Sequence, residues 1–389
     1  MQRSGIVATS AMALVLLVTA CATIATTAGP ARLQDTAAQS ATQASTAQPR
    51  IRNTQLATRA AGQNLDREFR DAVTAQQEPA WIGYAVPAVS DRTSVCCGNW
   101  RDGHYTAGCC RMEQDHGMNI HTPDEDEKRE LAPVALEPAL FVFYRAAERR
   151  VTNIRIFSAD CELDAGGRPV IWLTGVRPEE SVALLKSFIR SETDWSERDD
   201  RSVAKRAITA IAMHAGSAAD QALEQMAAPD QPEAVRKHVA FWLGEARGQR
   251  GYQVLRRMLR EDPSDDVREK AIFGLHVSDQ PQALDAIIAT ARDDRSRKVR
   301  GQALFWLGQK AGKKATGAIT GAIENDPDTY IKKKAVFALS QLPKDEGVPL
   351  LIQVARTNRN AAVRKQAMFW LGQTGDPRAL AFFEEVLKR

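Results

Sequence analysis

The stretch VRGQALFWLG, residues 299–308, is one of six related segments that begin 32 residues apart along the second half of the chain. The others are VAKRAITAIA (203–212), VRKHVAFWLG (235–244), VREKAIFGLH (267–276), IKKKAVFALS (331–340) and VRKQAMFWLG (363–372). Five steps of equal length exclude chance, and a period of this size is typical of solenoids built from stacked helical units. A second apolar segment separates successive copies, so we expect two helices in each repeat.

Helical periodicity predicts the interior of this solenoid. Counting the first residue of each copy as position 0, positions +4, +7 and +8 lie on one helix face at about 100° per residue. Position +8 is leucine in the last five copies: Leu243, Leu275, Leu307, Leu339 and Leu371. Position +7 alternates between tryptophan and a small residue: Trp242, Gly274, Trp306, Ala338 and Trp370. The preceding helix alternates in the opposite sense, through Ala227, Leu259, Ala291, Ile323 and Ala355. Close packing favours such volume compensation, so we predict that the tryptophans belong to the core.

The repeats resemble a known family. In most copies an acid stands six residues before the Arg of Val-Arg-x-x-Ala-x-x-x-Leu-Gly, a pattern similar to bacterial HEAT-like repeats of the phycobilisome-lyase type over about residues 200–389. The resemblance implies a mainly α fold, with a HEAT-like α-solenoid over residues 191–389, and such repeats mostly serve as binding scaffolds. Bilin lyase activity is not carried over, because only the generic repeat matches. HEAT-like iron hydroxylases need His-Glu pairs, whereas His238 and His276 are each followed by valine.

A ladder of acids and bases accompanies the repeats. The acid positions are Asp230, Asp262, Asp294, Asp326 and Asn358, and the basic positions are Arg236, Arg268, Arg300, Lys332 and Arg364. A short polar side chain here suits the start of a helix, and the arginine can bond to the neighbouring repeat's acid. The alternative is an anion-binding row. We favour the structural role, because the ladder belongs to the repeat consensus.

Position +6 predicts the binding site. It is phenylalanine in the last five copies: Phe241, Phe273, Phe305, Phe337 and Phe369. This position lies about 150° from the centre of the core face, beside Lys237, Lys270, Lys333 and Lys365. In families of this type the second helix lines the concave surface, so the stripe predicts an apolar groove for a protein or peptide. Alternatively each ring seals the seam with the next helix, and both roles hold if the rings keep one side open.

The beginning of the chain indicates export. Residues 1–21 read as a lipoprotein-like export signal in which Cys21 is acylated, and an ordinary cleavage site is the alternative. Residues 22–79 are rich in Ala, Thr, Gln and Ser, so we expect a disordered tether with a helix at 54–77. The expected location is the periplasm or cell envelope, with lipid anchoring to a membrane as one option.

Residues 80–190 predict a small Cys-rich α+β domain that leads into the solenoid and caps its first repeat. Strands are expected at 140–146, 151–158 and 169–175, followed by a helix at 178–190. The segment CC-x11-CC offers the disulfide candidates Cys96, Cys97, Cys109 and Cys110, which are expected to pair within the segment, while Cys161 stands apart. A metal site with His104, His116 and His121 is the alternative, although the spacing is not that of a zinc knuckle.

Charge and motifs bear on function. Residues 201–389 hold 31 Lys and Arg against 22 Asp and Glu, a net charge of +9, which favours acidic peptides, anionic lipid head groups or envelope polymers as partners. Export and the absence of a base-reading motif argue against nucleic acid.

No phosphate loop, Gly-x-Ser-x-Gly or His-Glu-x-x-His is present, and His214, His238 and His276 are expected at the surface or in seams. We therefore predict a non-enzymatic envelope scaffold without a cofactor or metal. The alternative is a thiol- or metal-dependent envelope factor centred on the cysteine segment.

Overall fold

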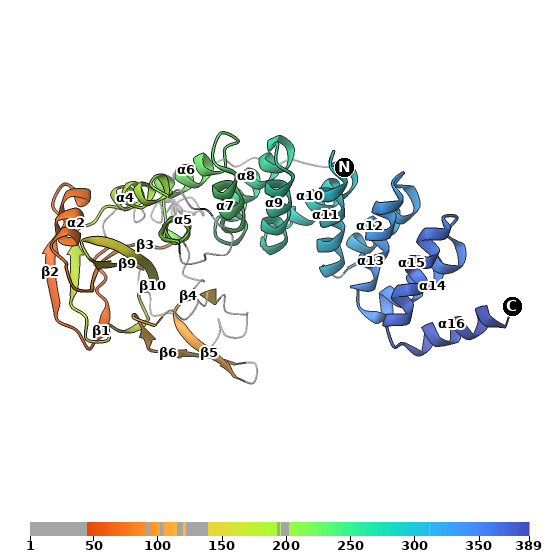
Figure 1. Ribbon diagram of the computed structural model, residues 1–389, viewed down its shortest axis with the longest axis horizontal. Helices are drawn as coiled ribbons and strands as arrows, with labels where there is room; N and C mark the ends of the chain where they lie inside the picture. Colours follow the sequence, from red (N-terminus) through yellow and green to blue (C-terminus); the bar gives the residue numbers. More distant parts are fainter. Residues whose placement is uncertain are drawn as a thin grey trace, which may run out of the picture.

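The computed structural model describes residues 45–89, 94–101, 104–114, 120–121, 139–192, 195, 202–310 and 312–388. The predicted export signal, the lipidation site Cys21 and the first part of the predicted tether lie outside these residues. Figure 1 shows a β-sheet domain at one end, from which paired helices follow one another in an arch. Within the described part of the chain, no helix has the length and apolar character needed to cross a membrane.

The β-sheet domain is built on a mixed five-stranded sheet with the order β10-β9-β3-β12-β2. Its strands are β2 (Leu56–Ala60), β3 (Ala80–Pro87), β9 (Ala139–Ala147), β10 (Arg150–Ser158) and β12 (Val170–Thr174). Strand β9 runs antiparallel to β3 and β10, whereas β12 runs parallel to β3 and β2. The three strands expected from the sequence are confirmed within one residue at each end, and the helix expected at 178–190 is α4 (Pro178–Arg190).

Smaller sheets accompany this sheet. One has the order β1 (Arg50–Arg52), β11 (Glu162–Asp164) and β7 (Cys110–Arg111), with parallel pairing throughout. Two further pairs are β4 (Ser94–Val95) with β8 (Ile120–His121), and β5 (Cys97–Arg101) with β6 (His104–Gly108). The cysteine segment therefore lies in short strands at one side of the domain.

Both faces of the five-stranded sheet are covered, because alternate residues of a strand point to opposite faces. Tyr84 and Tyr144 belong to a core that includes α2 (Leu65–Thr74), α4 and the solenoid. Trp81 and Phe143 belong to a second core that includes Cys96, Cys110 and Cys161. At Gly83 a Cβ atom would lie 2.4 Å from the Phe143 ring, so this position of β3 has room only for glycine.

The expected boundary between tether and domain is wrong. Strands β1 and β2 and helix α2 belong to the β-sheet domain, and α2 begins at Leu65 rather than near residue 54. Every residue of β2 is exposed, so the strand has none of the apolar alternation that marks a buried one. Its pairing with β12 relies on backbone hydrogen bonds, which the sequence pattern does not reveal.

The solenoid consists of helices in two rows. The row that carries the ten-residue copies is α5 (Val203–Met213), α7 (Glu233–Ala246), α9 (Asp265–Val277), α11 (Arg297–Gln309), α13 (Thr329–Ser340) and α15 (Ala361–Gln373). The other row is α6 (Ser217–Met226), α8 (Gly248–Glu261), α10 (Ala283–Asp293), α12 (Lys313–Asn325), α14 (Lys344–Thr357) and α16 (Pro377–Leu387). The prediction of a helical-hairpin solenoid is confirmed. Gly244 permits the close approach of α7 to α9, because a Cβ atom there would lie 1.9 Å from the carbonyl oxygen of Gly274.

The acid–base ladder joins successive repeats, as predicted. Arg236 Nε donates to Asp262 at 2.7 Å, and Arg268 Nε donates to Asp294 at 2.9 Å. Each of these aspartates also accepts the backbone N–H of the serine two residues later, which is the N-cap of the following helix. Arg300 continues the ladder to Asp326 at 3.6 Å, whereas Lys332, at the next predicted rung, donates to the backbone oxygen of Glu324 instead. The role of the ladder is structural, since Arg268 is completely buried.

The β-sheet domain caps the first repeat of the solenoid. Backbone bonds join Ala215 N to the Pro87 carbonyl at 2.8 Å and Val89 N to the Met213 carbonyl at 2.9 Å. Strand β10 and helix α4 both pack against α5. Thr209, which stands at position +6 of the first copy, is consequently buried, whereas the phenylalanines of the later copies are not fully covered.

A buried hydrogen-bond chain crosses this junction. His214 Nδ1 lies 2.6 Å from the Ala210 carbonyl oxygen, which only accepts, so Nδ1 carries the proton. His214 Nε2 therefore accepts from Ser181 at 2.8 Å, Ser181 accepts from Tyr84 at 2.7 Å, and Tyr84 accepts from Tyr144 at 2.6 Å. These directions hold for neutral His214, whose pKa is lowered to about 4 by burial and, further, by the nearby Arg247 charge. The expectation of a surface or seam histidine is wrong here, because His214 is completely buried.

Replacing Arg268 by alanine should lower the free energy of unfolding by about 3–5 kcal/mol, because Asp294 keeps a buried charge without its partner. Urea denaturation measures this change. The matched control is Arg292→Ala, which breaks an exposed pair with Asp293 and should leave stability almost unchanged. Similar effects of the two substitutions would contradict a structural role for the ladder.

Stability should also depend on the protonation of His214. The unfolded chain binds a proton at the ordinary pKa of 6.5, while the folded chain binds it only near 4. The free energy of unfolding should therefore rise with pH between these values, by up to about 3 kcal/mol from this group. The free energy of unfolding is measured across this pH range for the unchanged protein and for His214→Gln. The difference between the slopes of the two curves against pH gives the contribution of His214. Parallel curves would show that His214 does not titrate on unfolding.

Candidate partner-binding site

Aromatic side chains at positions +6 and +7 form one continuous row across five repeats, which we call the aromatic ladder. Its members are Phe241, Trp242, Phe273, Trp306, Phe305, Phe337, Trp370 and Phe369. Two kinds of contact link neighbouring repeats. The phenylalanines of α7 and α9 stack at 5.7 Å and those of α11 and α13 at 6.2 Å, whereas Trp306 and Trp370 each lie 4.9 Å from the phenylalanine of the preceding repeat.

The alternation at position +7 decides how the ladder forms. Where Gly274 or Ala338 occupies this position, the tryptophan of the next repeat packs against the phenylalanine one residue earlier, stacked for Trp306 and tilted for Trp370. The prediction that the tryptophans belong to the core is confirmed for Trp242, which is buried. Trp306 and Trp370 are half-buried: they pack against the core and also form part of the ladder. The sequence did contain a signal for these ring contacts, namely the glycine and alanine at position +7, but the sequence analysis did not relate it to the phenylalanines.

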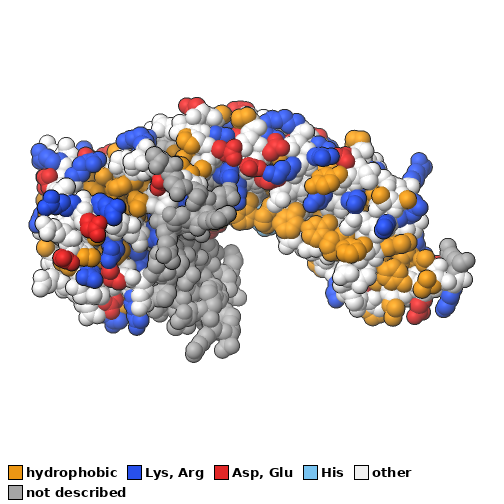
Figure 2. Space-filling model, viewed as in Figure 1, with side chains coloured by type: hydrophobic (Ala, Val, Ile, Leu, Met, Phe, Trp, Pro, Cys, Tyr) orange, Lys and Arg blue, Asp and Glu red, His pale blue; other side chains and the backbone are white. Residues whose placement is uncertain are grey.

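The ladder is partly open to solvent. Its first four phenylalanines are half-buried, and Phe369 is 54% exposed. Figure 2 shows a band of hydrophobic side chains along the inner edge of the arch. The phenylalanines therefore pack in the seams between repeats and also present apolar surface to solvent.

The four predicted lysines stand one helical turn before ladder phenylalanines. Lys270, Lys333 and Lys365 are exposed, and none of the three forms an ion pair among the residues that the structure describes. Lys237 is half-buried, with its Nζ 3.9 Å from Glu233. The structure thus places the predicted cations beside the aromatic row rather than in the acid–base ladder.

His276 is a member of the site that the sequence did not indicate. Its imidazole lies 4.4 Å from the ring of Trp306 and 6.5 Å from Phe273, so it extends the ladder sideways. Burial lowers the pKa of His276, and the charge of Lys310 lowers it further. The imidazole is therefore mainly neutral at physiological pH and packs as a further ring.

The tryptophans contribute rings rather than hydrogen-bond donors to this surface. Nε1 of Trp242, Trp306 and Trp370 is buried and has no acceptor within reach in the described part of the chain. These N–H groups are directed away from solvent. A partner that lies on the ladder therefore meets ring carbon atoms and the flanking lysine ammonium groups.

The cysteine segment differs from the sequence prediction. Cys96 forms a disulfide with Cys161, with 5.5 Å between their Cα atoms, and Cys110 is also disulfide-bonded. Cys109 is a half-buried free thiol. Pairing within CC-x11-CC is therefore wrong for Cys96 and Cys109. Strand β11 lies between β1 and β7, which carries Cys161 to the cysteine segment despite a separation of 65 residues.

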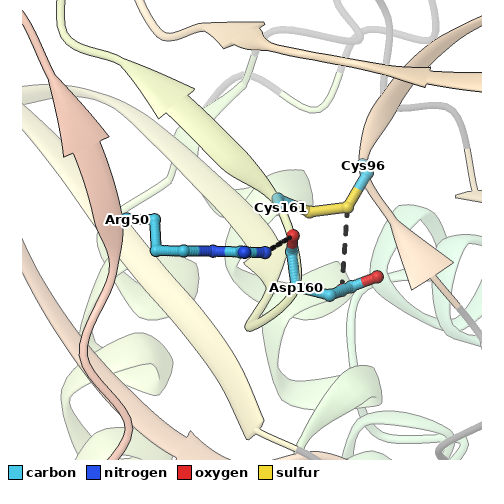
Figure 3. The surroundings of a disulfide bond; sticks show 4 residues. All are labelled: Arg50, Cys96, Asp160 and Cys161. Atoms are coloured by element: carbon cyan, nitrogen blue, oxygen red, sulfur yellow. Dashed lines mark hydrogen bonds between the residues drawn. A yellow bond between two sulfur atoms is a disulfide. The ribbon is translucent and has the colours of Figure 1, made fainter.

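Figure 3 shows the surroundings of this disulfide. Arg50 donates to the backbone oxygen of Asp160, and the Asp160 carboxylate lies 3.8 Å from Cys96 Sγ. Ligand atoms of Cys96, Asp160 and Cys161 lie within 4.8 Å of one another. The two sulfurs are bonded to each other and so cannot act as thiolate ligands. The side chains of His104, His116 and His121, considered for a metal site, lie outside the described residues.

Comparison with known proteins identifies the repeats. The family described as HEAT repeats matches residues 194–276, 219–308, 284–355 and 318–389. No curated protein matches the chain. Human deoxyhypusine hydroxylase is similar at 17% identity, over 54% of this chain and 90% of its own, with a TM-score of 0.25. The CpcE–CpcF phycocyanin lyase complex from Nostoc sp. is similar at 22% identity, over 39% of this chain and 98% of its own, with a TM-score of 0.30.

Proteolysis without reductant should release a disulfide-linked pair of peptides containing Cys96 and Cys161, because the structure brings their Cα atoms to bonding distance. An alkylating reagent applied after denaturation, before any reduction, should label Cys109. Mass spectrometry identifies both products, and a reduced sample is the control. A peptide pair that links Cys96 to Cys109 or Cys110 would contradict this connectivity.

Proposed function

This chain belongs to the HEAT-repeat family, and from that premise we propose that it is a non-enzymatic scaffold of the cell envelope. The solenoid binds a protein or peptide partner along the aromatic ladder. The observation that carries the proposal is the continuity of the ladder. Eight rings in mutual contact cross five repeats and keep part of their apolar surface open.

Packing between repeats does not by itself require such a row. The leucines at position +8 are fully or almost fully buried and already fill the interior between the two rows of helices. Large exposed apolar patches on a protein usually mark an interaction site, because exposing them without a partner is unfavourable. The phenylalanine of each repeat adds one apolar contact, so the surface suits an elongated partner that touches several repeats.

The location and the role of the β-sheet domain complete the proposal. An export signal at residues 1–21, processed at Cys21 or by ordinary cleavage, directs the chain to the envelope. The β-sheet domain caps the solenoid and fixes its first repeat. The disulfide between Cys96 and Cys161 favours a structural role for the cysteine segment over thiol or metal chemistry.

Crosslinking capture from the envelope fraction of the source cells tests the proposal. The baits are the full chain, Phe369→Ser, and a variant with Phe273, Phe305 and Phe337 changed to serine. Capture of a defined partner should fall at least about tenfold with the triple variant, a loss of about 1.4 kcal/mol of binding free energy. It should fall measurably with Phe369→Ser, which alters only an exposed ring.

The matched control is Leu380→Ser, which removes a side chain that is 61% exposed and outside the ladder. It should leave capture unchanged. Circular dichroism and thermal unfolding establish that each bait is folded, and Phe369→Ser decides the question if the triple variant is not. Equal capture by all folded baits would reject the ladder as the binding site.

A further inference from the structure

We infer that the partner of the aromatic ladder is an acidic polypeptide segment in which aspartate or glutamate alternates with apolar side chains. This inference rests on the proposed function and adds the chemistry of the partner. It follows from two features of the ladder: the way its rings face one another, and the charge beside them.

The ladder joins its rings in more than one way. Phe241 and Phe273 stack with an angle of 22° between their planes, Phe273 and Trp306 with 30°, and Phe305 and Phe337 with 11°, whereas the Phe–Trp neighbours on one helix meet edge to face. The exposed part of the row is apolar ring carbon, which apolar side chains of a partner can cover. The edge of an aromatic ring carries partial positive charge, which attracts a carboxylate.

The same geometry argues against other extended ligands. Single-stranded nucleic acids bind by stacking bases on open aromatic faces. Proline-rich segments likewise dock against aromatic surfaces that are free to receive a pyrrolidine ring. Here five of the eight rings already have a stacked neighbour, and the indole N–H groups are buried. A chain whose side chains insert apolar groups and carboxylates against the edges is the better match.

Lysine charge reinforces the positive ring edges. Lys270 precedes Phe273 by three residues, a spacing that makes two side chains neighbours on a helix surface. Lys333 and Lys365 each precede a ladder phenylalanine by four residues, which has the same effect. The nearby acid Glu269 lies 3.4 Å from Lys298, which it shares with Asp266. These three groups carry one net negative charge, which is fewer than the three positive charges of Lys270, Lys333 and Lys365. The lysines beside the ladder therefore leave a positive potential that steers an acidic partner.

Distances set the length of the segment. Packed helices are about 8–10 Å apart, so the five helices of the ladder span about 32–40 Å. An extended chain rises about 3.3 Å per residue, which corresponds to about 10–12 residues. Alternation suits an extended segment because successive side chains point to opposite sides. One side then meets the ring edges and the other reaches the lysines.

Fluorescence anisotropy with the purified full chain tests the inference. The probe is a labelled pool of twelve-residue peptides, about the length of the ladder, with glutamate alternating with Phe, Leu, Ile or Val. A second pool has lysine in place of glutamate, and a third has serine in place of the apolar residues. The acidic–apolar pool should bind at least about tenfold more tightly than either other pool, and binding should weaken as salt rises.

Two charge variants show where the peptide lies. Changing Lys270, Lys333 and Lys365 to glutamine should weaken binding of the acidic pool at least about tenfold. The matched control changes Lys313, Lys344 and Lys388 to glutamine, which removes the same net charge from exposed positions of the other helix row. This control should bind the pool as the unchanged protein does.

Other outcomes overturn the inference in distinguishable ways. Equal binding of the acidic and basic pools, or no binding of either while the ladder still captures a partner, rejects the acidic segment but leaves the proposed function standing. Binding to vesicles of phosphatidylglycerol but not to the peptides would assign the charge to a lipid surface. If both lysine variants lost affinity for the acidic pool equally, the peptide would be attracted by the net charge of the protein rather than by the lysines beside the ladder.

Discussion

Two neighbouring junctions of this solenoid are fixed by a buried arginine, Arg236 or Arg268, that bonds to the aspartate of the next repeat. The contact does two things at once, since the same aspartate also accepts the backbone N–H of the serine at the N-cap of the following helix. A guanidinium without its carboxylate would be costly at these positions, because both groups are removed from water. Register between repeats is therefore specified by charge as well as by shape, and the alignment of the aromatic ladder depends on that register.

Much of the fold could be predicted because its determinants are local and repeated. The 32-residue period, the leucines at position +8 and the acid–base spacing each occur several times, and together they predicted a helical-hairpin solenoid. Strands β9 and β12 were equally readable because they carry apolar runs, and β10 because it is rich in β-branched and aromatic residues. Strand β2 was missed because all its residues are exposed and only its backbone is paired. The partner of Cys96 was missed because it depends on a parallel strand pairing between distant segments.

The candidate site, like the fold, was predictable where it depends on local sequence and not where it depends on contacts between distant residues. Helical spacing placed the five phenylalanines and the four lysines on one surface, because an angle on a helix is a local property. It did not place Trp306, Trp370 or His276 there. Each of the two tryptophans packs against a preceding repeat that has glycine or alanine at position +7, and His276 packs against Trp306 of the following repeat. All three positions therefore depend on contacts between repeats. The burial of His214 likewise depends on the β-sheet domain that packs over the first repeat.

The position of the stacked rings has a mechanical consequence. Because the ladder crosses successive repeats along one row of helices, any change in the curvature of the solenoid would change the separation of its rungs. Each stacked pair has a preferred separation, so the row acts as a spring that opposes change of curvature in both directions. A partner bound along the aromatic ladder would then meet a surface of nearly constant shape. Stiffness of this kind reduces the conformational entropy lost on association, because the surface is already arranged before contact.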